Sequence, residues 1–147
     1  SSAASDVYKR QGEHHGILVI DDYAHHPTEI LATLAAARAG WDRRIVAVFQ
    51  PHTYTRTRDF FQAFAESFAN ADVLVLTDVY AAREPAIEGV SGALIADAAR
   101  LAGHSQVHYV PHSSDVRDYL QSILQPGDLV LTMGAGDIWK VGVELLG

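Results

Sequence analysis

The sequence contains no cysteine, which excludes disulfides, thiolate metal sites and a cysteine nucleophile. Basic residues are scarce as well: 11 lysines and arginines stand against 18 aspartates and glutamates, a formal charge of −7. An acidic chain repels phosphate backbones and anionic lipid, so we expect neither a nucleic-acid-binding nor a membrane-surface protein. No apolar run approaches the ~20 residues of a membrane span, and no secretory leader opens the chain. We therefore expect a cytoplasmic protein.

The composition is that of a globular domain, with 48% hydrophobic residues in 147. Residues 1–11 are small, polar and aperiodic, and we expect a disordered or foreign leader there and a single domain over 12–147. Short aliphatic runs predict strands at 16–20, 44–49, 72–77, 106–110 and 128–132. Apolar residues at helical spacing, with start and stop signals around them, predict helices at 27–39, 58–69, 92–102, 114–124 and 135–146.

Strands and helices thus alternate along the chain, which implies a mainly parallel sheet with right-handed crossovers. The strand runs are continuously apolar rather than alternating, which is typical of strands covered on both faces. The sequence therefore predicts an α/β fold: a Rossmann-like three-layer sandwich, with helices on both faces of a sheet of five to six strands.

Such sheets bind ligands beyond the carboxyl ends of their strands, and polar residues gather there after the first predicted strand. Asp22 is placed to accept hydrogen bonds from sugar hydroxyls, and His25 to donate to a phosphate oxygen. A helix that begins at Pro27 presents free N–H groups to an anion at the same place. Asp21 and His26 are equally well explained as caps of the turn and of the helix.

A second polar segment, QPHTYTRTRDF at 50–60, follows the second predicted strand. Arg56 and Arg58 lie near the start of a helix, where the dipole opposes a cation, so a carboxylate or phosphate partner is expected. A guanidinium binds either anion in bidentate fashion. For Arg58, an ion pair with Asp59 is the alternative. His52 has two interpretations, as a wall of a small pocket or as a packing residue.

The segment after the last predicted strand is rich in glycine, and Gly134 and Gly136 would let the backbone approach a ligand closely. The third glycine of a dinucleotide-binding motif is missing, because Trp139 stands there. The phosphate-binding motif GxxxxGK[ST] is absent from the sequence too.

Two further patterns favour ordinary structural roles. Arg83 and Glu84, adjacent in the long third loop, predict a salt bridge or a solvated surface. His25 and His26 are not expected to bind a metal, because adjacent loop residues rarely converge on one ion and no third ligand at helical spacing was apparent.

Three segments, in this order, resemble the C-terminal domain of the Mur ligases: DDYAHHPTEI at 21–30, FQPHTYTRTRDF at 49–60 and GDLVLTMGAGDIWKVG at 127–142. The resemblance implies an ATP-dependent, amide-forming ligase of peptidoglycan biosynthesis. In that family ATP and Mg²⁺ activate the carboxylate of UDP-N-acetylmuramate as an acyl phosphate, and the amine of L-alanine attacks it. Two further domains of the ligase, which bind the UDP-sugar and ATP, are lacking here, so we expect the chain alone to be inactive.

The resemblance also implies roles for individual residues. It places Asp22 at the ATP ribose and His25 near the γ-phosphate and the metal, and it makes His25 and Arg56 catalytic. The residues that it places near the amino acid and the acyl phosphate are Tyr23, His52, Arg56, Gly134, Gly136 and Asp137. Thr53 stands where the family often has an arginine, so one carboxylate contact is absent or replaced.

Three alternatives remain open at this point. A ligase that reattaches recycled murein peptides to the same UDP-sugar shares the first motif. A receiver-like signalling domain would use Asp78 as its phosphorylated residue, although the hydroxyl residue and the lysine that it needs after its fourth and fifth strands are missing. A free-standing nucleotide-binding module would bind ATP without further domains.

Overall fold

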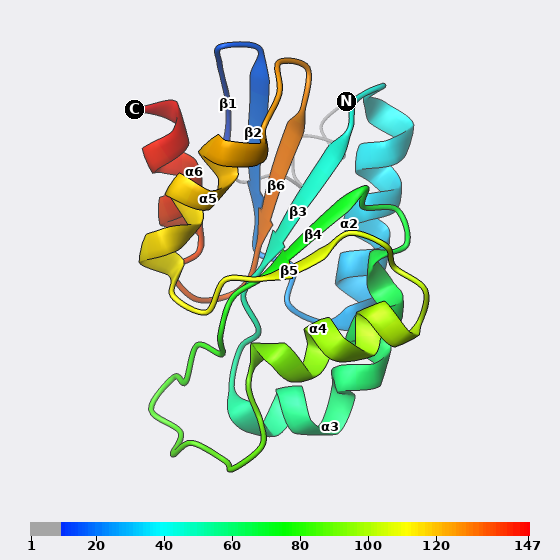
Figure 1. The fold of residues 1–147 in the computed structure, drawn as a ribbon, viewed down its shortest axis with the longest axis vertical. Helices are drawn as coiled ribbons and strands as arrows, with labels where there is room; N and C mark the ends of the chain where they lie inside the picture. Colours follow the sequence, from blue (N-terminus) through cyan, green and yellow to red (C-terminus); the bar gives the residue numbers. More distant parts are fainter. Residues whose placement is uncertain (1–9) are drawn as a thin grey trace.

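The computed structural model describes residues 10–147, which form a six-stranded sheet between two layers of helices (Figure 1). The strand order is β1-β2-β6-β3-β4-β5; β1 is antiparallel to β2, and the other pairs are parallel. The strands are β1 (Arg10–His14), β2 (Ile17–Asp22), β3 (Ile45–Phe49), β4 (Val73–Leu76), β5 (Val107–Tyr109) and β6 (Leu129–Met133). The helices are α2 (Pro27–Gly40), α3 (Tyr54–Ala65), α4 (Gly92–Leu101), α5 (Val116–Ile123) and α6 (Trp139–Leu146).

The two faces of the sheet carry separate hydrophobic cores because successive side chains of a strand point to opposite faces. On one face, Phe49 of β3 packs against Phe64 and Phe68, with ring centroids 5.2 and 5.4 Å away, under α2, α3 and α4. On the other face, valines of β2, β3, β4 and β6 form a second core with residues of α5 and α6. Figure 1 shows these two helices on that side of the sheet. All residues of β3 and β6 are buried. The predicted three-layer α/β sandwich is confirmed.

The antiparallel strand β1 departs from the predicted elements. It begins at Arg10, so residues 10 and 11 belong to the sheet and not to the leader expected over 1–11; residues 1–9 lie outside the described part. A two-residue turn with positive φ at His15 (52°) and Gly16 (79°) joins β1 to β2. The segment RQGEH is polar and lacks an apolar period, so no pattern in it predicts a strand.

Helix α3 begins at Tyr54, four residues before the predicted start at 58. Thr53 is its N-cap, and the Thr53 hydroxyl accepts a hydrogen bond from the Arg56 backbone N–H at 3.3 Å. Helix α6 begins later than predicted, at Trp139 instead of 135, which leaves the glycine-rich segment as a turn. Among the helices formed by residues 10–147, none combines the length and the apolar character needed to cross a membrane.

Candidate active site at the carboxyl ends of the strands

Asp22 ends β2 and is buried, with a relative exposure of 6%. One carboxylate oxygen accepts a hydrogen bond from the Ala24 backbone N–H (2.8 Å), and the other accepts one from the Thr33 hydroxyl of α2 (3.2 Å). The carboxylate therefore fixes the turn between β2 and α2. It also lines a surface hollow of about 350 Å³, together with Tyr23 and Glu29 among others.

His25 follows in that turn and is oriented through one ring nitrogen. Its Nδ1 lies 2.9 Å from the carbonyl oxygen of Tyr23 and 3.6 Å from a carboxylate oxygen of Glu29. A carbonyl oxygen only accepts, so this hydrogen bond places a proton on Nδ1. The second nitrogen, Nε2, remains to face a ligand.

Glu29 of the same motif lies in the first turn of α2, where an acidic residue suits the positive end of the helix dipole. The same oxygen accepts the backbone N–H groups of His25 and His26, at 3.1 Å each. Partial burial acts to raise the pKa of Glu29, but these N–H groups and the charges of the two histidines outweigh it, and the pKa lies below its usual value.

His25, His26 and Glu29 offer metal-ligating atoms within 4.8 Å of one another. The premise that no third ligand stands at helical spacing is therefore wrong, since Glu29 is one. Its oxygen is already bound to two N–H groups, however, and the cluster lies at the positive end of α2, which disfavours a cation. The absence of a metal here stays a prediction.

His52, after β3, lies beside His25 at the same edge, with ring centroids 6.2 Å apart. Tyr80, from the connection between β4 and α4, stacks on its other side at 5.7 Å and an interplanar angle of 14°. The buried Nδ1 of His52 has no hydrogen-bond partner among the described residues. Burial, then the charges of Arg56 and His25, lower the pKa of His52, while the charge of Glu84 opposes them. The imidazole is therefore neutral at neutral pH.

Thr53 connects His52 to α3 in a conformation that a β-branched residue rarely adopts, with φ 67° and ψ 146°. Its backbone is held from both sides: the N–H donates to the carbonyl of Tyr80 (2.9 Å), and the carbonyl accepts the hydroxyl of Thr57 (2.8 Å). Such strain persists only where the surroundings fix it, and it gathers at functional sites. Here it turns the chain sharply between His52 and the first turn of α3.

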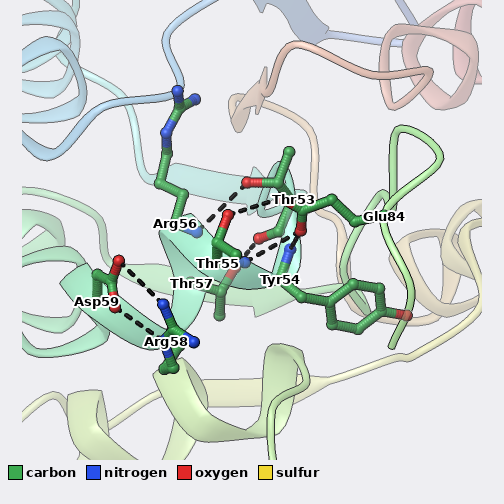
Figure 2. Close-up of polar contacts among 8 residues, drawn as sticks. All are labelled: Thr53, Tyr54, Thr55, Arg56, Thr57, Arg58, Asp59 and Glu84. Carbon is green, nitrogen blue, oxygen red and sulfur yellow. Dashed lines mark hydrogen bonds and ion pairs between the residues drawn. The ribbon is translucent and has the colours of Figure 1, made fainter. Parts of the chain in front are cut away.

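Arg56 lies in the first turn of α3 and is half-buried. Figure 2 shows its side chain extending away from Arg58 and Glu84. In the described part of the chain the Arg56 guanidinium makes no hydrogen bond or ion pair, although its charge acts on His52. Arg58, by contrast, is exposed and pairs with Asp59 at 2.8 Å, which confirms the structural alternative for that residue.

The glycine-rich turn after β6 packs against both motifs. The N–H of Gly134 donates to the carbonyl of Asp22 (3.3 Å), and Asp137 exchanges hydrogen bonds with the side-chain amide of Gln50, at 2.9 and 3.1 Å. A Cβ added to Gly136 would lie 2.6 Å from Cγ of Tyr80. The backbone does approach another group closely here, but that group is protein. Contacts of Gly134, Gly136 and Asp137 with substrate stay predictions.

Arg83 and Glu84 form no ion pair with each other in the described part of the chain, so the predicted salt bridge is wrong, and Arg83 is exposed, as the solvated-surface alternative expects. The Glu84 carboxylate instead accepts hydrogen bonds at the start of α3: from the N–H of Tyr54 (2.7 Å), and from the N–H (3.1 Å) and hydroxyl (2.6 Å) of Thr55 (Figure 2). The first N–H groups of a helix lack partners within the helix, so a carboxylate is well placed there. Asp78 has a similar role, because it accepts the N–H groups of Val79 (2.8 Å) and Gly92 (3.1 Å).

Together, the fold and the site define an α/β domain with imidazole and guanidinium groups at the carboxyl edge of its sheet. A profile of the Mur ligase, glutamate ligase domain matches residues 8–136, and the chain belongs to this family.

Similar proteins carry more specific names. A UDP-N-acetylmuramate–L-alanine ligase of Salinibacter ruber is 59% identical over 143 residues, which are 95% of this chain and 30% of that protein. The crystal structure of a UDP-N-acetylmuramate–alanine ligase from Thermotoga maritima matches with a TM-score of 0.74 and 27% identity, over 94% of this chain and 28% of that one. The chain therefore spans about 30% of the length of the relatives that it matches.

A third match bears on the domain by itself. A single domain of a putative UDP-N-acetylmuramate:L-alanyl-γ-D-glutamyl-diaminopimelate ligase from Haemophilus ducreyi has been crystallised. It matches with a TM-score of 0.67 and 26% identity, over 95% of this chain and 94% of that one. That domain, which is similar to this chain in size and fold, was crystallised apart from the rest of its ligase.

Proposed function

We propose that the chain is the C-terminal domain of a cytoplasmic, ATP-dependent ligase that joins L-alanine to UDP-N-acetylmuramate in peptidoglycan biosynthesis. The observation that carries the proposal is the half-buried Arg56 guanidinium, which has no partner in the described structure and stands beside the neutral imidazole of His52. The choice of substrates is supported by the names of the relatives, which are 49–59% identical.

The chemistry of such a ligase requires these groups. Phosphorylation of the muramate carboxylate gives an acyl phosphate; the amine nitrogen then attacks the acyl carbon, phosphate leaves, and an amide forms. Arg56 stabilises the negative charge on the carboxylate or acyl phosphate in bidentate fashion. Neutral His52 accepts the proton that the amine loses. His25, with both ring nitrogens protonated, donates to a phosphate oxygen through Nε2 while Nδ1 keeps its hydrogen bond to the Tyr23 carbonyl.

The hollow beside Asp22 is a suitable place for the ATP ribose. The Asp22 carboxylate is oriented at the carboxyl end of β2 by the Ala24 N–H and the Thr33 hydroxyl, and a carboxylate is a suitable acceptor for the hydroxyl groups of a ribose. Mg²⁺ would come with the phosphates, held mainly by the ATP-binding domain of the ligase. Tyr23, with an exposed fraction of 55%, and the turn of Gly134, Gly136 and Asp137 complete the proposed substrate contacts.

A chimera tests the proposal: this chain replaces the corresponding region of the Salinibacter ruber ligase. We expect phosphate release from ATP that requires both UDP-N-acetylmuramate and L-alanine, and a product mass equal to that of the amide. We expect no turnover from the 147 residues alone. A folded chimera without activity, or turnover by the isolated chain, would overturn the proposal.

The same assay addresses the peptide-recycling alternative. A murein peptide ligase from Psychrobacter arcticus also matches this chain, with a TM-score of 0.74 and 26% identity. If the chimera used a murein tripeptide and not L-alanine, that alternative would replace the present one. We expect the opposite preference.

A further inference from the structure

The connection between β4 and α4, residues 77–91, contacts the candidate site at two places. Near its start, the backbone of Tyr80 pairs with the second motif: its N–H donates to the carbonyl of Pro51 (2.8 Å), and its carbonyl accepts the N–H of Thr53 (2.9 Å). Further along, Glu84 binds the first turn of α3 through three hydrogen bonds (Figure 2). One loop therefore fixes the segment that carries both His52 and Arg56.

Helix α3 needs this support because its own sequence opposes its start. Its first turn contains no acidic residue, yet Arg56 and Arg58 place two positive charges near the positive end of the helix dipole. Thr53, whose backbone is strained, directly precedes the first residue of the helix. Glu84 supplies the missing negative charge from another part of the chain and satisfies two N–H groups that have no partner within the helix.

We propose that Glu84 is a positioning residue for amide formation: it holds the first turn of α3 so that Arg56 and His52 stay together, facing His25. This inference rests on the proposed function. Glu84 does not touch the reacting atoms, because its oxygens are directed to Tyr54 and Thr55. Its effect passes through the backbone of α3.

The carboxylate also has an electrostatic effect, which separates this role from simple packing. The charged groups that face His52 are Arg56 from α3, His25 from the β2–α2 turn and Glu84 from the β4–α4 connection. The two cationic groups disfavour a protonated His52, whereas Glu84 favours it. Loss of the Glu84 charge must therefore lower the pKa of His52 further.

The test compares Glu84→Gln with Glu88→Gln in the chimera described above. Glu88 lies in the same connection, is exposed, and makes no hydrogen bond or ion pair within residues 10–147, so it is a matched control. We expect Glu84→Gln to lower kcat/KM for L-alanine by about 10- to 100-fold, because small misplacements of catalytic groups are costly. The KM for ATP and the activity of the Glu88→Gln variant should stay close to wild type. The melting temperature of Glu84→Gln should fall by a few degrees at most, because the glutamine side-chain oxygen still accepts an N–H group.

Two further variants probe the hydroxyl contact alone. Thr55→Val removes the hydrogen bond to Glu84 and should lower kcat/KM in the same direction, but by less. Thr55→Ser keeps the hydroxyl and should restore activity. Loss of activity in Thr55→Ser equal to that in Thr55→Val would count against the proposed role.

A measurement without turnover completes the test. Ring-nitrogen NMR of the 147-residue chain reports the titration of His52, and we expect its midpoint at lower pH in Glu84→Gln than in Glu88→Gln. Equal midpoints together with equal activities would overturn the inference. So would equal midpoints together with a fall in activity that only follows a fall in melting temperature. An inactive wild-type chimera would overturn the proposed function. If the His52 midpoint still differed between Glu84→Gln and Glu88→Gln, the role of Glu84 in holding the first turn of α3 would stand.

Discussion

The charged side chains at the two ends of the sheet differ in whether they are paired within the domain. At the amino ends of the strands, where no ligand is expected, arginines are paired: Arg38 lies 2.8 Å from Asp72, and Arg44 lies 2.9 Å from Asp128. At the carboxyl ends, the guanidinium of Arg56 has no partner in the described part of the chain. Arginine side chains therefore form ion pairs within the domain at the amino ends of the strands, and one remains available to bind an anion at the carboxyl ends.

Asp128 shows how complete the pairing is at the amino end. Its carboxylate is almost buried and accepts two hydrogen bonds from Arg44, at 3.1 and 2.9 Å, and one from the N–H of Gln125, at 2.8 Å. Arg44 in turn donates to the carbonyl of Ile123 (3.0 Å). Buried polar groups are normally satisfied in this way, so the unsatisfied groups at the carboxyl end call for an explanation, and a ligand supplies one.

The largest effect that this comparison predicts is on catalysis. In the active chimera, Arg56→Gln should lower kcat/KM by about 10²- to 10³-fold, as does the loss of other groups that stabilise developing negative charge. Its melting temperature should barely change, because the guanidinium has no contact to lose. Arg58→Gln, two residues away and paired with an exposed Asp59, is the control and should retain activity. If the Arg56→Gln enzyme were as active as Arg58→Gln, the unpaired guanidinium at the carboxyl ends of the strands would have no role in catalysis.

The amino end should respond in the opposite sense. Asp128→Asn leaves Arg44 without its charged partner, and we expect the free energy of unfolding to fall by about 2 kcal/mol, measured by urea denaturation of the chain. Ring titration of His52 should not change. Asp118→Asn removes an exposed partner of Arg117 and should cost less than about 0.5 kcal/mol. If the free energy of unfolding fell by a similar small amount in both variants, the ion pair between Arg44 and Asp128 would contribute little to stability.

Much of the fold could be predicted because the parallel strands are apolar on both faces and the helices between them have an apolar period. β1 escaped prediction because a polar edge strand makes its contacts through its backbone. The start of α3 at Tyr54 was missed because Glu84, which accepts the first two N–H groups of the helix beside the local N-cap Thr53, lies 30 residues further along the chain. A cap from a distant segment leaves no local pattern.

The site was predicted to a similar degree. Polar residues after β2 and β3 had to meet, because parallel strands end at one edge, and His25 does lie beside His52. The sequence distinguished Arg58 from Arg56 only by the adjacent Asp59, and the structure confirms that Arg58 pairs with this residue. The role of Glu84 was missed because its partners, backbone N–H groups and a hydroxyl at the start of α3, lie about 30 residues earlier in the chain.

A smaller effect tests whether packing alone requires the glycine-rich turn. Gly136→Ala places a methyl group against Tyr80 and the side-chain oxygen of Gln50, both 2.6 Å from the added Cβ. We expect a loss of about 1–2 kcal/mol in the free energy of unfolding. Gly40→Ala, at the end of α2 with no atom within 4 Å, should be neutral or stabilising by about 0.5 kcal/mol. If Gly136→Ala were as stable as Gly40→Ala, the turn would have room for a side chain, and ligand contact would become the better explanation of the glycine.

The smallest expected effect is on the pH dependence of stability. Burial lowers the pKa of His52 in the folded chain, so as the pH falls below the ordinary imidazole value of about 6.5 the unfolded chain takes up a proton first. Protons bound preferentially by the unfolded state reduce stability. The free energy of unfolding should therefore decrease as the pH falls from about 6.5 to the lowered pKa of His52 in the folded chain. Above about pH 6.5, His52 should not change the pH dependence of stability. His52→Gln should flatten that decrease, whereas His112→Gln, an exposed residue at the same edge, should not. Denaturation curves at a series of pH values distinguish the two variants. If the free energy of unfolding depended on pH with the same slope in wild type and His52→Gln, the His52 imidazole would be solvated like a surface histidine. It would then not be a neutral proton acceptor at the site.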